Sequence, residues 1–220
     1  MYIKAFEVNP FSENTYLIYD DTKEAIVVDP GFFSPHEQAN FLNFLKENKL
    51  NLVQSINTHC HIDHVFAWEF IYDKFGLKPT FHQNDLALLK TINEQAKLFG
   101  ISWQLGNIPY NKHIEVSSKI SFGNTNLDVL FCPGHAPGHV VFHEPKSNVC
   151  LVGDVIFRQS IGRTDLPFCN PAHLEKSIQE VIYKLPSDCT LFPGHGPTTT
   201  VGHEMTSNPF VRPKDRERKT

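Results

Sequence analysis

The 220-residue chain lacks the features that mark several classes of protein. No apolar run approaches the roughly 20 residues of a membrane span, and the first residues lack a signal peptide's uninterrupted apolar core. The formal charge of −4 and the pI near 6.3 give no basic footprint for nucleic acid. We therefore expect a cytoplasmic protein that binds neither membranes nor nucleic acid.

Cysteine is sparse and scattered along the chain. The five cysteines never form a C-x-x-C pair, so neither a disulfide framework nor a structural zinc knuckle is indicated, and we interpret them as reduced thiols. No G-x-S-x-G motif is present, which argues against a Ser-His-Asp triad. The length and composition suit one large core, and we expect one domain over residues 1–210 with a basic, solvated tail over 211–220.

What the chain does contain is a dense cluster of ligand-type side chains, Thr58-His59-Cys60-His61-Ile62-Asp63-His64. A strand-like run precedes the cluster and helical periodicity follows it, so the side chains should converge in a strand-to-helix loop. His59 and His61 suit one divalent ion, and Asp63 and His64 could serve a second. Converging polar groups are costly without a shared partner, which favours a metal site over a chance gathering of histidines.

The rest of the chain alternates strands and helices. We predict a hairpin from strands 16–19 and 25–28, a helix that begins at Ser34 with a Ser34–Glu37 capping box, a short strand over 78–82, and a helix capped by Asn84 that runs to Gly100. Residues 101–123 should be loop and short strand that border the site. Strands over 126–130, 140–143, 149–152 and 190–192 and a helix from Asn170 to Leu185 complete an α/β pattern.

Three of the later strands end in a glycine followed by a ligand-type residue: Gly134-His135, Gly153-Asp154 and Gly194-His195. A glycine there lets the backbone turn sharply and leaves room beside an ion. Together with the first cluster this makes seven candidate ligands, five imidazoles and two carboxylates. That set suits two adjacent transition-type ions and suits calcium or magnesium poorly.

This order of motifs resembles the metallo-β-lactamase superfamily over nearly the whole chain. The segments 58–64, Pro133-Gly134-His135-Ala136-Pro137-Gly138-His139, Gly153-Asp154 and Gly202-His203-Glu204 with Asn208-Pro209-Phe210 are similar to the glyoxalase II branch, and especially to its short bacterial hydrolases. The resemblance implies an αββα sandwich in which two mixed β-sheets are flanked by helices, with the metals along one edge.

The resemblance also implies roles for the candidate ligands. His59, His61 and His135 would bind one metal, Asp63, His64 and His195 the other, and Asp154 would bridge them. His139 would support the site without binding metal, or simply pack in its loop. We expect two divalent ions, zinc first with iron or manganese left open. Their shared hydroxide would cleave a thioester such as S-lactoylglutathione to a hydroxy acid and a thiol, with Asp63 and Asp154 as catalytic residues.

The chain departs from the longer glyoxalase II enzymes in two places. Those enzymes continue into a helical domain that helps to hold glutathione, so we expect that half of the substrate site to be missing. Arg163 could grip a substrate carboxylate, or it could pair with Asp165 on the surface. The expected partner is a small-molecule thioester substrate. We expect the chain to be a monomer or a homodimer.

Other interpretations of the same residues stay open. A mono-iron persulfide dioxygenase would use His59, His135 and Asp154. A non-enzymatic binding module should have lost some ligand, whereas all seven are present. β-Lactam hydrolysis would not explain why the chain has the glyoxalase-type C-terminal motif. Asp29, before Pro30-Gly31, could either support the metal ligands or serve the turn alone, and Cys60 should point away from the metal.

Overall fold

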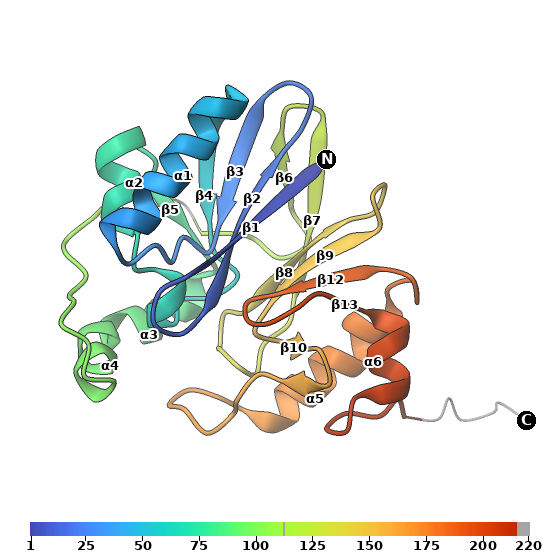
Figure 1. Cartoon of the computed structure of the whole chain (residues 1–220). Coiled ribbons are helices and arrows are strands. Elements are labelled where there is room, and N and C mark those ends of the chain that lie inside the picture. The colour runs from blue at the N-terminus through green and yellow to red at the C-terminus, as the bar shows by residue number, and fades with distance from the viewer. Residues whose placement is uncertain (112, 215–220) are drawn as a thin grey trace, which may run out of the picture.

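The computed structural model describes residues 1–111 and 113–214. Two β-sheets pack face to face, and helices cover both outer faces (Figure 1). The α/β sandwich expected from the sequence is therefore confirmed. Residues 215–220 of the predicted basic tail lie outside the described residues.

The first sheet is mixed and has the strand order β1-β2-β3-β4-β5. The first three strands pair antiparallel, and β3, β4 and β5 pair in parallel. Their bounds are β1 Tyr2–Val8, β2 Glu13–Tyr19, β3 Glu24–Val28, β4 Asn51–Ile56 and β5 Pro79–Thr80.

The second sheet is also mixed, with the order β13-β12-β9-β8-β7-β6. Only β9 and β12 pair in parallel within it. Its strands are β6 Lys119–Phe122, β7 Thr125–Phe131, β8 Val140–Glu144, β9 Val149–Gly153, β12 Thr190–Pro193 and β13 Thr199–Thr200. A separate hairpin joins β10 (Ile156–Phe157) to β11 (Ser160–Ile161).

The alternation of side chains along the strands builds the layers. In β2, Leu17 packs toward the helices α1 (Pro35–Asn48) and α2 (Trp68–Phe75), whereas its neighbour Ile18 packs against the second sheet. In β9, Leu151 faces the first sheet and Cys150 faces α5 (Pro171–Glu180) and α6 (Val201–Ser207). Buried apolar residues on both faces of each sheet hold the four layers together.

Most predicted elements are confirmed, with small shifts of their ends. Ser34 and Glu37 form the expected capping box, and Gly76 ends α2 in a left-handed conformation with φ of 68°. Asn170 caps α5 as expected by accepting the backbone N–H of His173. The five cysteines are free thiols.

The single helix expected between Asn84 and Gly100 is wrong. The structure has a 3₁₀ turn over Gln83–Asp85, then α3 (Leu86–Lys90) and α4 (Ile92–Leu98), and the break falls at Thr91. The Thr91 hydroxyl donates a hydrogen bond to the Leu88 carbonyl, which competes with the helix ladder. Asn84 does not cap; its backbone N–H is accepted by His82 instead.

Short elements escaped the sequence patterns. The strand expected over residues 78–82 is only β5, because it pairs with no more than Ser55 and Ile56. The short strand expected within residues 101–123 is β6, whereas the strands β1 and β13 and the helix α6 were not predicted. In β1 the strand is largely exposed, so its hydrophobic alternation is weak.

Candidate metal centre

The seven candidate ligands meet at one edge of the sandwich, where strands of both sheets end. The loop after β4 supplies residues 59–64, with Ile62–His64 wound into a 3₁₀ turn. The β7–β8 loop supplies His135, the end of β9 supplies Asp154, and the end of β12 supplies His195. Strand ends of the two sheets thus deliver side chains from distant parts of the chain to one place.

The seven candidate ligands include two groups of three whose ligand atoms converge, and the ligand atoms of Asp29, His59 and His64 form a third such group behind them. His59, His61 and His135, which we call the imidazole trio, have nitrogens within 4.8 Å of one another. Asp63, His64 and His195, the mixed trio, meet the same limit. The two trios are the groups that the family resemblance implies.

Asp154 lies between the two trios. Its Oδ2 is 3.5 Å from His135 Nε2 of the imidazole trio and 3.5 Å from His195 Nε2 of the mixed trio. Its Oδ1 is 3.5 Å from His64 Nε2. A carboxylate in this position can face two ions at once.

Hydrogen bonds on the far side of three imidazoles set which nitrogen carries a lone pair. His135 Nδ1 lies 2.8 Å from the Arg163 carbonyl, and His195 Nδ1 lies 3.1 Å from the Phe11 carbonyl. His59 Nδ1 lies 3.0 Å from Thr58 Oγ1, whose own proton goes to Asp29. In each ring Nδ1 donates, so Nε2 is the nitrogen that points into the cluster and presents a lone pair when the ring is neutral.

Several polar atoms of the cluster are buried without a hydrogen-bond partner among the described residues. His59 Nε2, His64 Nε2 and Asp154 Oδ1 are three of them. His61 Nδ1 and His135 Nε2 face each other at 2.8 Å. Buried lone pairs that converge without donors are expensive, and a cation is the partner that would satisfy them. The donor set of imidazole and carboxylate fits a divalent transition-type ion.

The imidazole trio is prepared to stay uncharged. Burial, followed by the neighbouring His135, lowers the pKa of His61 to about 3. Burial, followed by His64, lowers the pKa of His59 well below its ordinary value, and burial also lowers the pKa of His135. A neutral imidazole is the form that binds metal.

The mixed trio carries the opposite electrostatics. Burial opposes charge on His64, but Asp63, Asp154 and Asp29 outweigh it and hold the His64 pKa well above its ordinary value. Burial likewise acts to raise the pKa of Asp154, but His64 and His195 outweigh it, so the Asp154 pKa is lowered. The pKa of Asp63 is lowered in the same way, chiefly by His64. These carboxylates are ionised at neutral pH.

Asp29 supports the cluster, the first of the two roles left open by the sequence. Its carboxylate accepts the Thr58 backbone N–H at 2.7 Å and the Thr58 hydroxyl at 2.6 Å, and its Oδ2 lies 3.2 Å from His64 Nδ1. Asp29 adopts a left-handed backbone with φ of 51°, as turn chemistry also requires. It therefore anchors the metal loop and faces the back of His64.

Two further buried carboxylates were missed in the sequence. Glu13 is fully buried, accepts the Thr15 hydroxyl at 2.8 Å, and places Oε1 3.8 Å from His64 Nδ1. Asp85 accepts the backbone N–H groups of Cys60 and Gly138, so it ties the metal loop to the loop that carries His135. Burial raises the pKa of Asp85 to about 7. No motif surrounds either residue, so no sequence signal pointed to them.

His139 and Cys60 lie where the sequence placed them. His139 belongs to neither trio; its Nε2 accepts the Asp154 backbone N–H at 3.1 Å, and its ring stacks on His59. Cys60 packs in an apolar cluster and also belongs to neither trio. A Cβ at Gly194 would clash with Asp154 Oδ1, which explains the glycine before His195.

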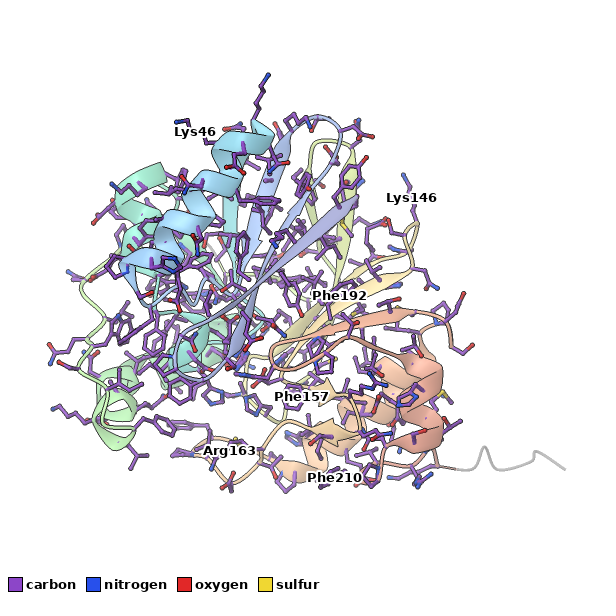
Figure 2. All side chains as sticks on the ribbon, viewed as in Figure 1. Lys46, Lys146, Phe157, Arg163, Phe192 and Phe210 are labelled. Atoms are coloured by element: carbon purple, nitrogen blue, oxygen red, sulfur yellow. The ribbon has the colours of Figure 1, made fainter. Side chains whose placement is uncertain are left out.

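A cavity of about 670 Å³ opens above this floor of polar residues. His61, Asp63, Asp154 and His195 line its base, and α3, α4, the β10–β11 hairpin and the segment before α5 form its walls. Figure 2 shows Phe157 and Arg163 in the lower part of the molecule, on the segment that leads into α5. A volume of this size holds a small organic ligand.

Arg163 lines the cavity, but its guanidinium already has a partner. Nε and Nη2 donate to the two carboxylate oxygens of Asp165 at 2.8 Å each, and both side chains are exposed. The residue also has an unexpected role, because its carbonyl accepts from His135. Of the two roles left open by the sequence, the structure has Arg163 in the surface pair.

The C-terminal motif acts from outside the cluster. Glu204 is fully buried and accepts the Gln159 backbone N–H at 2.9 Å, while Asn208 donates to the Ser160 carbonyl at 2.9 Å. These bonds hold the β10–β11 hairpin that forms one cavity wall. His203 lies beside Gln159 and is not part of either trio.

Comparison with known proteins agrees with this geometry. The family model of the metallo-beta-lactamase superfamily matches residues 8–207. The chain belongs to the metallo-beta-lactamase superfamily. Its members are metal-dependent, and a hydrolase with a metal-binding site is the general description that applies to this chain.

Individual superfamily members are similar over nearly their whole length. Hydroxyacylglutathione hydrolase GloC of Haemophilus influenzae is 34% identical over 215 residues, which cover 97% of this chain and 100% of GloC. The solved structure of the B3 metallo-beta-lactamase BLEG-1 has a TM-score of 0.86 at 32% identity, and the match covers 96% of this chain and 99% of the BLEG-1 chain. TTHA1623 in a di-iron-bound form has a TM-score of 0.84 at 32% identity, covering 94% and 100%.

No helix among the described residues is long and apolar enough to cross a membrane.

Proposed function

We propose that the chain is a dinuclear metal-dependent hydrolase that cleaves a thioester, of which S-lactoylglutathione is one example. The observation that carries the proposal is Asp154, whose carboxylate lies 3.5 Å from His64, His135 and His195 and so joins the two trios at the base of an open cavity. The similarity to GloC supports the choice of a thioester. Zinc is the first candidate for both ions, with iron and manganese as alternatives.

In the proposal each trio would hold one ion, and the Asp154 carboxylate would be available to both. Divalent ions held in such a site activate water near neutral pH and stabilise negative charge on a carbonyl oxygen. His59, His61 and His135 are neutral and present their lone pairs, because burial lowers the pKa of each. Asp29, through Thr58 and beside His64, keeps both trios in position.

We assign to Asp63 the role of orienting the attacking water, which is the nucleophile. Asp63 lines the cavity, its pKa is lowered so that it is ionised, and its Oδ2 lies 3.1 Å from His195 Nε2. An ionised carboxylate there can accept a hydrogen bond from the attacking water and orient it. Water adds to the thioester carbonyl carbon, the carbon–sulfur bond breaks, the thiol leaves with one proton, and the carboxylic acid remains.

The test is an activity panel on one preparation loaded separately with zinc, iron and manganese. We expect thioester hydrolysis by at least one metal form, loss of hydrolysis with a chelator, and recovery on adding metal back. The matched variants are Asp63→Asn and, as a control, the exposed Asp73→Asn. A metal-loaded enzyme that leaves every thioester intact would refute the proposal.

β-Lactam hydrolysis is a second candidate, favoured by the BLEG-1 neighbour at 32% identity. The panel therefore includes a chromogenic cephalosporin. It also includes oxygen uptake with glutathione persulfide, because a mono-iron dioxygenase would use His59, His135 and Asp154. Turnover of the cephalosporin, or oxygen uptake by an iron form, without thioester hydrolysis would replace the proposed reaction with that one.

A further inference from the structure

The walls of the cavity differ in chemistry from its base. Most of the lining residues above the ligand cluster are apolar, and the largest are Phe11, Leu98, Phe99, Phe157, Leu166 and Phe168. They come from the segment before β2, from the end of α4 and the residue after it, from β10, and from the segment between β11 and α5. The apolar surface therefore surrounds the base on several sides.

Part of this apolar surface faces solvent. Leu98 is 73% exposed, Phe168 is 49% exposed and Phe99 is 38% exposed, and all three line the same cavity. Large apolar side chains gathered around a concave site are typical of a surface that a ligand covers. Their position above His61 and Asp63 makes a substrate the natural occupant.

The charged groups on the walls do not suit an anionic ligand. Arg163 is the lining cation among the described residues, and Asp165 already pairs with it through two hydrogen bonds of 2.8 Å. Glu94 adds a carboxylate to the wall. Glutathione carries two carboxylates, and the described walls offer them no unpaired cation.

We infer that the substrate carries an extended, uncharged apolar arm that lies against Leu98, Phe99 and Phe168, rather than the charged tripeptide of glutathione. This inference rests on the proposed thioester hydrolysis and names its substrate class. An arm of roughly six to ten carbons, as an alkyl chain or an aromatic group, suits a cavity of this volume. The arm belongs either to the acyl group or to the thiol.

Two series of thioesters separate these sources. The first series varies the acyl group from acetyl to octanoyl on the neutral thiol N-acetylcysteamine. The second series keeps an acetyl group and varies the thiol from ethanethiol to octanethiol. We expect kcat/KM to rise at least about tenfold along one series, since each buried methylene contributes up to roughly fourfold. The best member should exceed S-lactoylglutathione.

Variants of the wall show where the arm lies. Leu98→Ala and Phe168→Ala should each lower kcat/KM roughly tenfold more for the longest thioester than for the acetyl thioester. Both side chains are exposed, so their loss should leave the fold intact. The control Tyr2→Ala removes an exposed ring from β1, far from the cavity, and should keep the full rise.

The outcomes separate the inference from the proposed function. A flat response in both series, or a preference for S-lactoylglutathione, overturns the inference and leaves thioester hydrolysis standing. If no thioester is hydrolysed, the proposed function fails, and binding of the inert ketone decan-2-one then decides about the arm. Binding that Leu98→Ala and Phe168→Ala weaken about tenfold supports the apolar site, and equal binding overturns it.

A second copy of the chain is the other occupant to exclude. Sedimentation velocity would detect a dimer, and Leu98→Asp would test whether the apolar wall forms its interface. A dimer that this substitution converts to a monomer, with no chain-length dependence in either series, would overturn the inference.

Discussion

The two trios lie side by side at one edge of the sandwich, but their surroundings prepare them differently. In the imidazole trio burial dominates, the pKa of every ring is lowered, and the nitrogens are neutral. In the mixed trio the carboxylates dominate, and the pKa values of His64 and His195 are raised. Two ions bound there would replace protons in the mixed trio but would find the imidazole trio already free of them.

Burial alone therefore does not set the charge of an imidazole ligand. His59 and His64 have rings only 4.1 Å apart, centroid to centroid, and are both fully buried. Asp29 and Glu13 stand behind His64, whereas the Thr58 hydroxyl stands behind His59. Burial acts against charge on both rings, but Asp63 and Asp154 outweigh it at His64, and Asp29 behind the ring adds to their effect.

The largest effect should come from removing the residue that joins the trios. Asp154→Ala should lose both ions and reduce thioester hydrolysis at least about 100-fold, since even groups behind a ligand are worth 10- to 100-fold. Metal analysis and kcat/KM on the same sample check this. The exposed Asp73→Ala is the matched control. Asp154→Ala protein that keeps both ions would show that the carboxylate does not bridge.

Removing one ligand from each trio should separate the ions. His59→Ala and His195→Ala are each expected to lower metal content by about one ion per chain, because three donors converge on each. Competition with a chromogenic chelator measures the content, and the exposed His173→Ala serves as the control. If His59→Ala removes both ions while His195→Ala removes none, the trios do not act as separate sites.

Asp29→Asn should have an intermediate effect. The amide keeps the shape of the carboxylate but loses the charge beside His64 and can no longer accept from both Thr58 groups with the same strength. We expect a tenfold or greater loss of metal affinity with a larger effect on the mixed trio. Calorimetric titration with metal measures the two affinities. Equal weakening of both sites would contradict a special role of Asp29 in the mixed trio.

The trios should also respond to pH with opposite sign in protein freed of metal. His61 has a folded pKa of about 3 against an ordinary 6.5, so between these values the unfolded chain binds more protons. Its contribution to stability is therefore present above pH 6.5 and falls by about 2 kcal/mol on going to pH 5. His64 has a raised folded pKa, so its contribution is present below pH 6.5 and is lost as the pH rises through the folded value.

Urea unfolding at pH 8 and pH 5 with a chelator measures these contributions. The free energy of unfolding of His61→Asn, compared with that of wild type, should improve on going from pH 8 to pH 5. That of His64→Asn should fall further below wild type at pH 5 than at pH 8. The same pH trend in both variants would contradict the opposite charge states of the two trios.

The smallest effect belongs to the surface pair at the cavity wall. Arg163→Gln removes an exposed guanidinium that pairs with Asp165, and such pairs contribute about 0.2 to 1 kcal/mol. The backbone carbonyl that His135 needs is retained. Hydrolysis of neutral thioesters should stay within about threefold, as kcat/KM would show. A loss above tenfold would give the side chain a role in binding.

Much of the site was predictable because its members are marked in the sequence. H-x-H-x-D-H and three glycine-led residues at strand ends identify seven side chains, and the structure brings all seven together. The alternation of strands and helices predicted the α/β class, and the family resemblance that the same motifs carry implied the sandwich. Their roles as ligands and catalysts remain predictions until metal is measured.

The supporting residues could not be predicted in the same way. Glu13 and Asp85 act through the folded arrangement, since each reaches a segment at least 25 residues away. The break in the helix at Thr91 and the apolar walls around Leu98 and Phe168 likewise depend on tertiary packing. The sequence marks the chemistry at the base of the cavity, and only the fold reveals the character of its walls.

The most direct test of the account is the metal content of the purified protein, measured together with thioester hydrolysis on the same sample. We predict about two divalent ions per chain and turnover that disappears and returns as the ions are removed and restored. One ion per chain with full turnover, or two ions with every thioester left intact, would contradict it.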